Sequence, residues 1–316
     1  MADFGYFLSS EELSPRELVR FGQAAERAGF DRVWVSDHFH PWTTEQGESA
    51  FVWSVLGALA ATTELDMTTA VTCPTYRIHP AVIAQAAATV ASLAPGRFTL
   101  GVGSGEALNE HVLGDAWPPV SVRLSRLEEA IGIIRRLWSG GVVTHLGEHF
   151  TVHDARVFSL PETLPEVLVS GFGPKATALA ARHGDGWITT KPDAEGMQTY
   201  RESGGSGRTQ AGLKICWAES EDEAAKTAYR LWGFQGAGGQ ISQDLPMWQG
   251  FEAIAELTGP EDMKRAVACG PDAGHAAELI SKYVEVGFDE IYIAQMGPDQ
   301  EGGISFLREE VIPLLG

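Results

Sequence analysis

Short runs of apolar residues alternate along the chain with longer stretches in which apolar residues recur every three or four positions. The first pattern is typical of buried strands, and the second of helices that pack one face against a sheet. The predicted strands are 4–8, 33–35, 67–71, 98–102, 167–169, 187–189, 213–218 and 290–294. The predicted helices are 14–28, 53–61, 80–93, 124–138, 175–182 and 306–314, and 142–152 is predicted to form a hairpin.

The first helix shows the signals most completely. Ser14 is a favourable N-cap, Pro15 suits the first helical position, and Gly29 stands where a helix ends. Leu18 and Phe21, with two alanines further on, repeat with a period near 3.6 and form one apolar face. This helix follows a strand directly, as in a repeating strand–helix unit.

Eight predicted strands interleaved with helices indicate a parallel sheet. A single (β/α)8 TIM barrel spanning residues 1–316, with insertions at its carboxyl-end mouth, fits the length better than a doubly wound two-domain fold. The glycine-rich stretch 203–212 is predicted to be flexible. Residues 232–262 lack clean periodicity and are predicted to form part of the active-site rim.

Composition excludes several classes of protein. Of 316 residues 44% are hydrophobic, which supports a large core and excludes a disordered chain. The net charge of −19 argues against binding nucleic acid or an anionic membrane. There is no long apolar segment and no export signal, and the three separated cysteines suggest no disulfide framework. A soluble cytoplasmic protein is therefore predicted.

The densest polar cluster follows the second predicted strand and runs from Ser36 to Trp42. In a barrel this position lies at the mouth, where catalytic groups collect. His38 exchanges protons near neutral pH, Asp37 could orient its neighbours, and Trp42 offers an aromatic wall. An ordinary surface loop with a capping Asp37 explains the same residues equally well.

A second cluster, 101–110, follows the fourth strand. Its glycines allow close approach of the backbone to a flat or anionic ligand, and Glu106 would place a carboxyl group at the mouth. The spacing is not the Gly-x-Gly-x-x-Gly dinucleotide fingerprint, and a plain glycine-rich turn remains an alternative.

Two further segments end predicted strands. Ser170–Lys175 places small residues before a helix N-terminus, which suits an anion, or forms a simple strand–helix turn. Cys73 is interpreted as a small buried residue rather than a nucleophile. The histidine spacing provides no metal-ligand set, and no serine-hydrolase elbow is present, so no metal is predicted.

Three segments together resemble the luciferase-like monooxygenase superfamily, and within it the branch typified by coenzyme F420-dependent glucose-6-phosphate dehydrogenase. They are 36–42, 80–85 and 101–110, and the resemblance is strongest through residues 1–190. It implies a TIM barrel, usually a homodimer, with the deazaflavin across the barrel mouth. The implied reaction moves a hydride between the hydroxyl-bearing carbon of an alcohol or sugar and C5 of the deazaflavin.

The resemblance also implies roles for individual residues. His38 corresponds to the general base, Trp42 to the residue that steadies developing charge, Glu106 to the proton donor for the cofactor, and Glu11 to a further active-site carboxylate. A non-prolyl cis peptide is implied at Ala70–Val71. The positions implied to contact the cofactor are Asp37, Ala70, Val71, Cys73, Gly105, Asn109, Ser170, Gly171, Phe172, Gly173 and Pro174.

The chain departs from this branch where a sugar phosphate would be bound. Asp193 stands about where a phosphate-binding lysine is expected, and residues 232–260 contain no Lys or Arg. The same segment contains Trp232, Phe234, Met247, Trp248 and Phe251. These aromatics either line a pocket for a neutral or apolar alcohol or simply pack the lid.

The preferred hypothesis is therefore an F420-dependent dehydrogenase that is not strict for glucose-6-phosphate. An FMN-dependent monooxygenase of the same superfamily and a barrel that binds a flavin without turnover are the alternatives. The presence of both His38 and Glu106 favours the dehydrogenase, because oxygen activation by a flavin does not require that acid–base pair.

Overall fold

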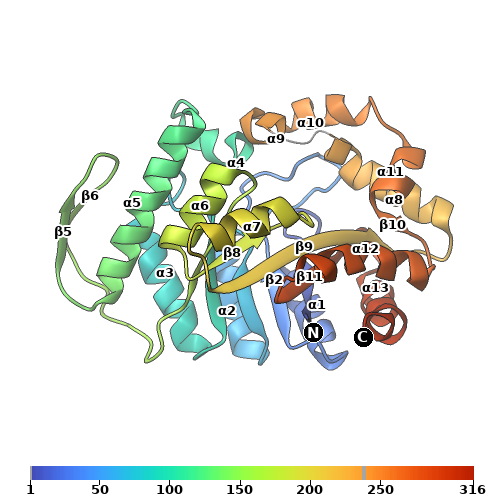
Figure 1. The fold of residues 1–316 in the computed structure, drawn as a ribbon, viewed down its shortest axis with the longest axis horizontal. Helices are drawn as coiled ribbons and strands as arrows, with labels where there is room; N and C mark the ends of the chain where they lie inside the picture. The colour runs from blue at the N-terminus through green and yellow to red at the C-terminus, as the bar shows by residue number, and fades with distance from the viewer. Residues whose placement is uncertain (1, 237–239) are drawn as a thin grey trace.

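Eight parallel strands close into a barrel in the computed structural model, which describes residues 2–236 and 240–316 (Figure 1). Each strand pairs with its neighbours in the order β9-β11-β1-β2-β3-β4-β7-β8, and the β8–β9 pairing closes the ring. The strands are β1 (Asp3–Leu8), β2 (Arg32–Val35), β3 (Asp66–Thr69), β4 (Phe98–Val102), β7 (Val167–Ser170), β8 (Gly186–Thr189), β9 (Arg208–Cys216) and β11 (Glu290–Gln295). The TIM barrel predicted from the strand–helix alternation is confirmed.

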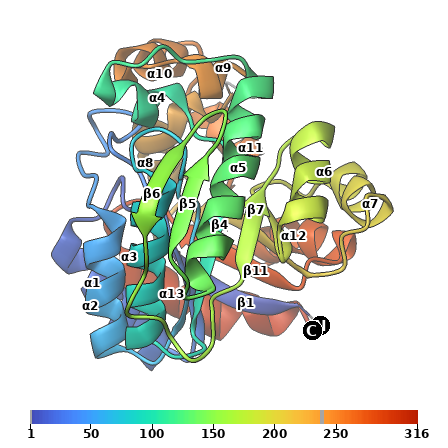
Figure 2. The same ribbon diagram turned by 90° about the vertical axis from the view of Figure 1, so that its left-hand side faces the viewer.

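Helices surround the barrel and alternate with its strands. They are α1 (Pro15–Arg27), α2 (Val52–Thr62), α3 (Pro80–Leu93), α5 (Val120–Trp138), α6 (Pro174–His183), α7 (Ala194–Glu202), α8 (Glu221–Trp232), α12 (Ala273–Val286) and α13 (Gln300–Phe306). The predicted hairpin is formed by β5 (Val143–Leu146) and β6 (Thr151–Ala155), and Figure 2 shows it on the outside of the molecule beside α5. The apolar faces of the helices pack against the strands and form the largest core cluster.

Short elements form the rim of the barrel. These are α4 (Ala107–Glu110), α9 (Gln240–Asp244), α10 (Trp248–Ala255) and α11 (Pro260–Ala266), followed by the two-residue strand β10 (Ala268–Cys269). Figure 1 shows α4, α9 and α10 gathered at the same end of the molecule. The described parts of the predicted rim segment, 232–236 and 240–262, therefore lie at the mouth, and residues 237–239 lie outside the described residues.

The barrel interior is filled by side chains in layers. Trp34 and Tyr292 stack with ring centroids 4.6 Å apart. Below them, the buried Glu290 pairs with Arg32 and Arg208, each at 2.8 Å. A buried carboxylate held by two guanidinium groups fills this end of the barrel, and a cavity lies at the opposite end.

Two sequence predictions are wrong in detail. Residues 208–212 are not flexible but belong to β9, because their polar side chains have buried partners: Thr209 Oγ1 donates to Asp289 at 2.8 Å, and Gln210 donates to Glu290 at 2.7 Å. The final helix does not run over 306–314. Helix α13 ends at Phe306, a π-helical turn occupies Leu307–Val311, and a 3-10 turn occupies Ile312–Leu314.

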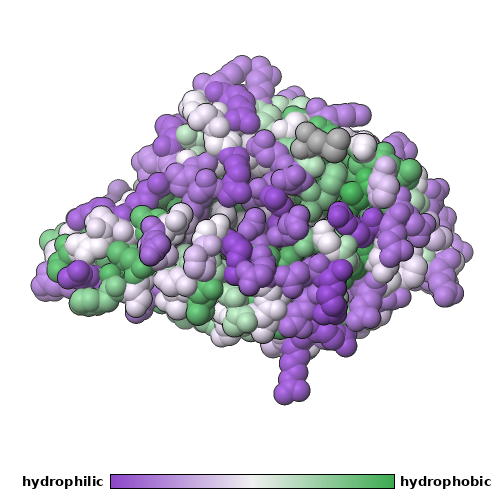
Figure 3. Space-filling view, turned by 90° about the horizontal axis from the view of Figure 1, so that it is seen from below, coloured by the Kyte–Doolittle hydropathy of each residue, from purple (hydrophilic) through white to green (hydrophobic). Residues whose placement is uncertain are grey.

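The face shown in Figure 3 is mostly hydrophilic, in keeping with 42 acidic and 23 basic residues. No helix in the described part of the chain has the length and apolar character needed to cross a membrane.

Candidate active site

A cavity of about 820 Å³ opens at the carboxyl ends of the barrel strands. Its wall contains all four residues predicted to be catalytic and every predicted cofactor contact except Gly171. The carboxyl ends of parallel strands are where loops bring functional groups together in this fold. The predicted site residues, although distant in sequence, therefore share one cavity.

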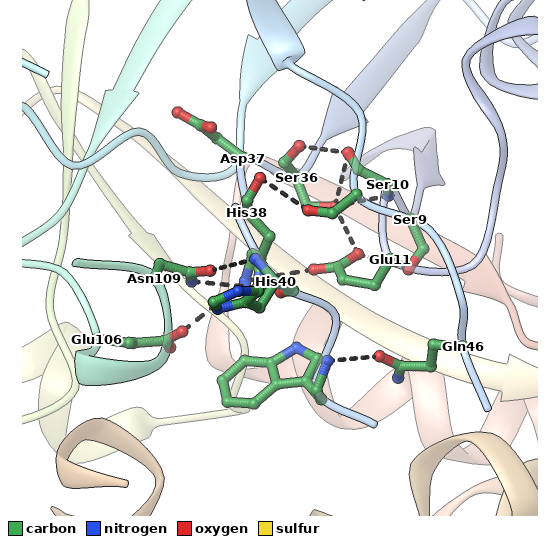
Figure 4. A network of polar contacts seen from close by, with 12 residues as sticks. Ser9, Ser10, Glu11, Ser36, Asp37, His38, His40, Gln46, Glu106 and Asn109 are labelled. Carbon is green, nitrogen blue, oxygen red and sulfur yellow. Dashed lines mark hydrogen bonds and ion pairs between the residues drawn. The ribbon is translucent and has the colours of Figure 1, made fainter. Parts of the chain in front are cut away.

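His38 lies between two carboxyl groups, as Figure 4 shows. Its Nε2 atom is 3.3 Å from Glu11 Oε1 and 3.8 Å from Glu106 Oε2. Its Nδ1 atom is 3.1 Å from both the His40 carbonyl oxygen and Asn109 Nδ2. In the tautomer that donates from Nδ1 to the His40 carbonyl oxygen, Asn109 Nδ2 donates no hydrogen bond to Nδ1, and the Nε2 lone pair can accept a proton.

Asn109 shapes the loop that carries this histidine. Its Oδ1 atom accepts hydrogen bonds from the backbone nitrogens of Phe39 at 2.9 Å and His40 at 3.2 Å. Because Asn109 belongs to α4, it ties the loop after β2 to the segment after β4 that bears Glu106. These contacts fix the spacing between the imidazole and the Glu106 carboxyl group.

Glu11 follows β1 and is buried. It accepts hydrogen bonds from Ser9 Oγ and Ser36 Oγ, each at 2.7 Å. Burial by itself would raise its pKa, but His38, Lys214 and the two hydroxyl groups outweigh burial, so the pKa of Glu11 lies below its ordinary value. Glu11 is therefore an ionised group beside the imidazole, and it attracts Nε2 once that atom carries a proton.

Glu106 differs in its surroundings, because no side chain of the described residues donates a hydrogen bond to its carboxyl group and about a third of its side chain is exposed. Burial raises the pKa of Glu106 to about 7, although His38 and Lys214 oppose the rise. Two carboxyl groups on either side of one histidine thus differ in protonation, which is a common arrangement of a fixed anion and an exchangeable acid.

Trp42 closes the site on the side of the rim. Its ring centroid lies 5.0 Å from that of His38, 5.3 Å from that of Phe234 and 5.0 Å from that of Phe251. Phe251 and Trp232 are almost fully buried. Of the five rim hydrophobics noted in the sequence, Trp232 and Phe234 line the cavity, whereas Met247, Trp248 and Phe251 do not. Phe251 packs against Trp42 and Phe234, and Trp248 packs against His40.

Asp37 and Cys73 are buried next to the cavity. Asp37 Oδ2 accepts a hydrogen bond from Thr72 at 2.7 Å, and Asp37 Oδ1 pairs with Arg77 at 2.8 Å. Burial raises the pKa of Cys73 well above its ordinary value, so its thiol is not a nucleophile. Between β3 and Cys73, the Ala70–Val71 peptide bond is cis, as the resemblance implied.

Glycines keep the cavity open near this wall. Gly105 has a φ of +83°, and a Cβ there would lie 2.6 Å from Cys73 Sγ; a Cβ at Gly103 would lie 2.8 Å from Val71 Cγ2. Gly171 plays another part, because a Cβ there would lie 2.7 Å from the backbone nitrogen of Thr177. Gly171 therefore allows α6 to approach β7, and it does not line the cavity.

The arrangement fits a flat, partly anionic cofactor such as F420. Apolar side chains including Val71, Ile188 and Phe172 offer surfaces for a ring system. The turn from Ser170 to Pro174 leads into the N-terminus of α6, where unpaired backbone N–H groups and Lys175 suit anionic groups. The ring system of such a cofactor would lie against the apolar wall, and its anionic tail would lie at the N-terminus of α6.

Two functional candidates escaped the sequence analysis. Arg77 pairs with Asp37 and lies 3.8 Å from Glu110 Oε1. Lys214, on β9, lines the cavity and interacts electrostatically with Glu11 and Glu106. A lysine between the apolar residues of a predicted barrel strand was the signal available for Lys214; nothing in the sequence paired Arg77 with Asp37.

Fold and site define an α/β-barrel enzyme with an acid–base cluster at its mouth. A family profile described as luciferase-like monooxygenase matches residues 2–290, and the chain belongs to this family. It is 36% identical to an F420-dependent glucose-6-phosphate dehydrogenase of Microbacterium testaceum (strain StLB037), covering 99% of this chain and 97% of the relative. It is 35% identical to an F420-dependent hydroxymycolic acid dehydrogenase of Mycobacterium tuberculosis (strain ATCC 25618 / H37Rv), covering 98% of this chain and 88% of the relative.

A solved structure is also similar over its full length. It is an F420-dependent secondary alcohol dehydrogenase in complex with an F420-acetone adduct, with a TM-score of 0.91 and 30% identity. The alignment covers 100% of this chain and 99% of that structure. The names of these three relatives thus give three different kinds of hydroxyl compound as substrates: a sugar phosphate, a hydroxymycolic acid and a secondary alcohol.

Proposed function

We propose that this protein is an F420-dependent dehydrogenase that oxidises an alcohol or sugar hydroxyl group, or runs the reverse reduction. The observation that carries the proposal is His38 Nε2 facing the cavity between Glu11 at 3.3 Å and Glu106 at 3.8 Å. An ionised carboxylate, an imidazole and an exchangeable carboxyl group are what proton transfer coupled to hydride transfer requires. The F420-dependent relatives support the choice of cofactor over FMN.

Each residue then has a definite task. Bound F420 supplies the carbon that exchanges a hydride with the substrate. His38 accepts the hydroxyl proton at Nε2, and Glu11 keeps the ring oriented and favours the imidazolium that forms. Glu106 holds a proton at its carboxyl group near neutral pH. Trp42 keeps water away from the imidazole on the rim side.

We further propose a neutral or apolar alcohol as substrate. The cationic residues of the described cavity wall are Lys175, Lys191 and Lys214. Lys175 and Lys191 are exposed and follow β7 and β8, while Lys214 stands among carboxyl groups. Asp193, at the position expected for a phosphate-binding lysine, caps α7 by accepting a hydrogen bond from Gly196 N at 2.8 Å. A dianionic phosphate would therefore find little positive charge near Trp42.

We also propose that the protein acts in the cytoplasm as a homodimer and that residues 1–316 form one domain. The core cluster that joins the helices to the strands from α1 to α13 supports a single domain. Light scattering of the purified protein tests the dimer: twice the chain mass of 34.0 kDa supports it, and the chain mass contradicts it.

The variant His38→Gln tests the proposed function. We expect it to lose F420 reduction with isopropanol or cyclohexanol by about 10²-fold or more, the scale of general-base catalysis, while still binding F420. Full turnover by this variant would remove His38 from the role of base. Glucose-6-phosphate should be a poor substrate, and inorganic phosphate a weak inhibitor; strong competition by phosphate would contradict the substrate proposal.

A further inference from the structure

Lys214 occupies an inward-facing position at the carboxyl end of β9. Gln210, four residues earlier, hydrogen-bonds to Trp34 inside the barrel at 2.8 Å, and Gly212 lies against the same ring. Since side chains two and four residues apart in a strand share a face, Lys214 points into the barrel as well. There its side chain lines the cavity together with Glu11, His38 and Glu106.

Two aromatic rings hold the ammonium group. Its nitrogen lies 4.1 Å from the ring centroid of Trp232 and 4.5 Å from that of Phe7. The Trp232 ring is itself fixed, because its Nε1 donates to Glu12 Oε1 at 2.6 Å while the Gly297 nitrogen donates to Glu12 Oε2 at 2.8 Å. These contacts are cation–π interactions, in which the ring faces attract the ammonium charge but do not form ordinary hydrogen bonds with it.

The ammonium group makes no hydrogen bond or ion pair with any residue in the described parts of the chain, 2–236 and 240–316. It interacts at longer range with Glu11 and Glu12 after β1 and with Glu106 after β4. Burial lowers the pKa of Lys214, and these three carboxyl groups oppose that effect. Burial thus disfavours a charged ammonium group at this position, and Glu11, Glu12 and Glu106 favour it.

The other charged groups facing this cluster are accounted for. His38, from the loop after β2, contacts Glu11 and Glu106 directly. Asp37 and Glu110 are both near Arg77, which does not line the cavity. Among these groups, Lys214 is therefore the cation that interacts with Glu11, Glu12 and Glu106 when His38 is neutral.

We propose that Lys214 is a positioning residue of the reaction: its charge keeps Glu11 ionised beside His38 and makes the proton of Glu106 easier to release. The proposal rests on the dehydrogenase function proposed above. Lys214 lowers the pKa of both carboxyl groups. Without it, Glu106 would retain its proton to higher pH, and Glu11 would hold the imidazole less firmly.

The test compares Lys214→Met, which keeps the length of the side chain and removes the charge, with Lys214→Arg, which keeps the charge. Protein without cofactor, labelled with ¹³C at glutamate carboxyl groups, is titrated by NMR, and Glu106→Gln identifies the Glu106 signal. Lys282→Met removes one charge from an exposed position outside the cavity and serves as the matched control.

We expect the Glu106 midpoint to rise by about one pH unit in Lys214→Met, because an opposite charge nearby shifts a carboxyl pKa by that order. The midpoint should stay near that of the wild type in Lys214→Arg and Lys282→Met. An unchanged midpoint in folded Lys214→Met overturns the proposal, as does an equal rise in Lys282→Met. If Lys214→Met does not fold, Lys214→Gln provides the same comparison.

The pH dependence of F420 reduction provides an independent test. The pH at which F420 reduction declines should move upward in Lys214→Met together with the Glu106 midpoint. Because the titration needs no cofactor, the two proposals fail differently. Absence of F420 turnover in the wild type contradicts the proposed function while leaving the NMR result intact, whereas normal turnover with an unmoved midpoint contradicts the role of Lys214.

Discussion

Glu106→Gln gives the sharpest prediction about the chemistry. Glutamine keeps the shape of the side chain but holds no exchangeable acid proton. The pKa of Glu106 is raised to about 7, chiefly by burial. Half of the molecules therefore carry the proton at pH 7, and about one in ten at pH 8. If the protonated form is required, oxidation of the alcohol slows about tenfold for each further pH unit.

The rate of F420 reduction, measured in a single turnover at saturating alcohol between pH 6 and 9, tests this directly. The wild type should show the decline above neutral pH, while Glu106→Gln should be slower by about 10²-fold and lack that decline. Glu278→Gln is the control, because it removes a carboxyl group from an exposed position outside the cavity. An unchanged decline in Glu106→Gln, or its loss in Glu278→Gln, would refute the assignment.

Two further predictions concern binding and stability. Gly105→Ala should weaken F420 binding by at least about tenfold in a fluorescence titration, since a Cβ at φ +83° would lie 2.6 Å from Cys73 Sγ. Gly114→Ala, at φ +86° with nothing within 4 Å of the added Cβ, should leave binding unchanged. Equal effects of the two substitutions would show that backbone strain alone is responsible. Arg77→Met should lower the free energy of unfolding in urea by about 3 kcal/mol, because it leaves the buried Asp37 carboxylate without its charged partner and with only the Thr72 hydrogen bond. Arg230→Met, which breaks an exposed pair with Glu45, should cost less than about 1 kcal/mol, and a similar loss in both variants would contradict the argument.

The barrel could be predicted because its strands are buried on both faces. Runs such as 98–102 and 290–294 are mostly apolar, with Thr99 and Glu290 as exceptions, and a polar or glycine-containing turn follows each. The pattern failed where polar side chains are buried in pairs. Thr209 and Gln210 look like loop residues in the sequence, yet Asp289 and Glu290 complement them inside the structure. Such pairing depends on the neighbouring strand, which a single sequence does not specify.

In the site, too, some residues could be predicted from the sequence and others could not. The clusters after predicted strands indicated His38 and Glu106, and the family resemblance added Glu11. The structure places all three in one cavity, since a parallel barrel brings all its strand ends together. Lys214 lies within a strand rather than in a loop, and its importance follows from Trp232 and Phe7, which are distant in sequence. The difference in pKa between Glu11 and Glu106 likewise depends on hydroxyl partners and on burial.

Separate titration of the purified protein with oxidised F420 and with FMN, followed by tryptophan fluorescence, tests the central claim most directly. Trp42 and Trp232 line the cavity and should be quenched when a ring system enters it. The account predicts micromolar or tighter binding of F420 and much weaker binding of FMN. Preference for FMN would contradict the account and favour a flavin-dependent monooxygenase, and binding of neither would contradict a cofactor-dependent enzyme altogether.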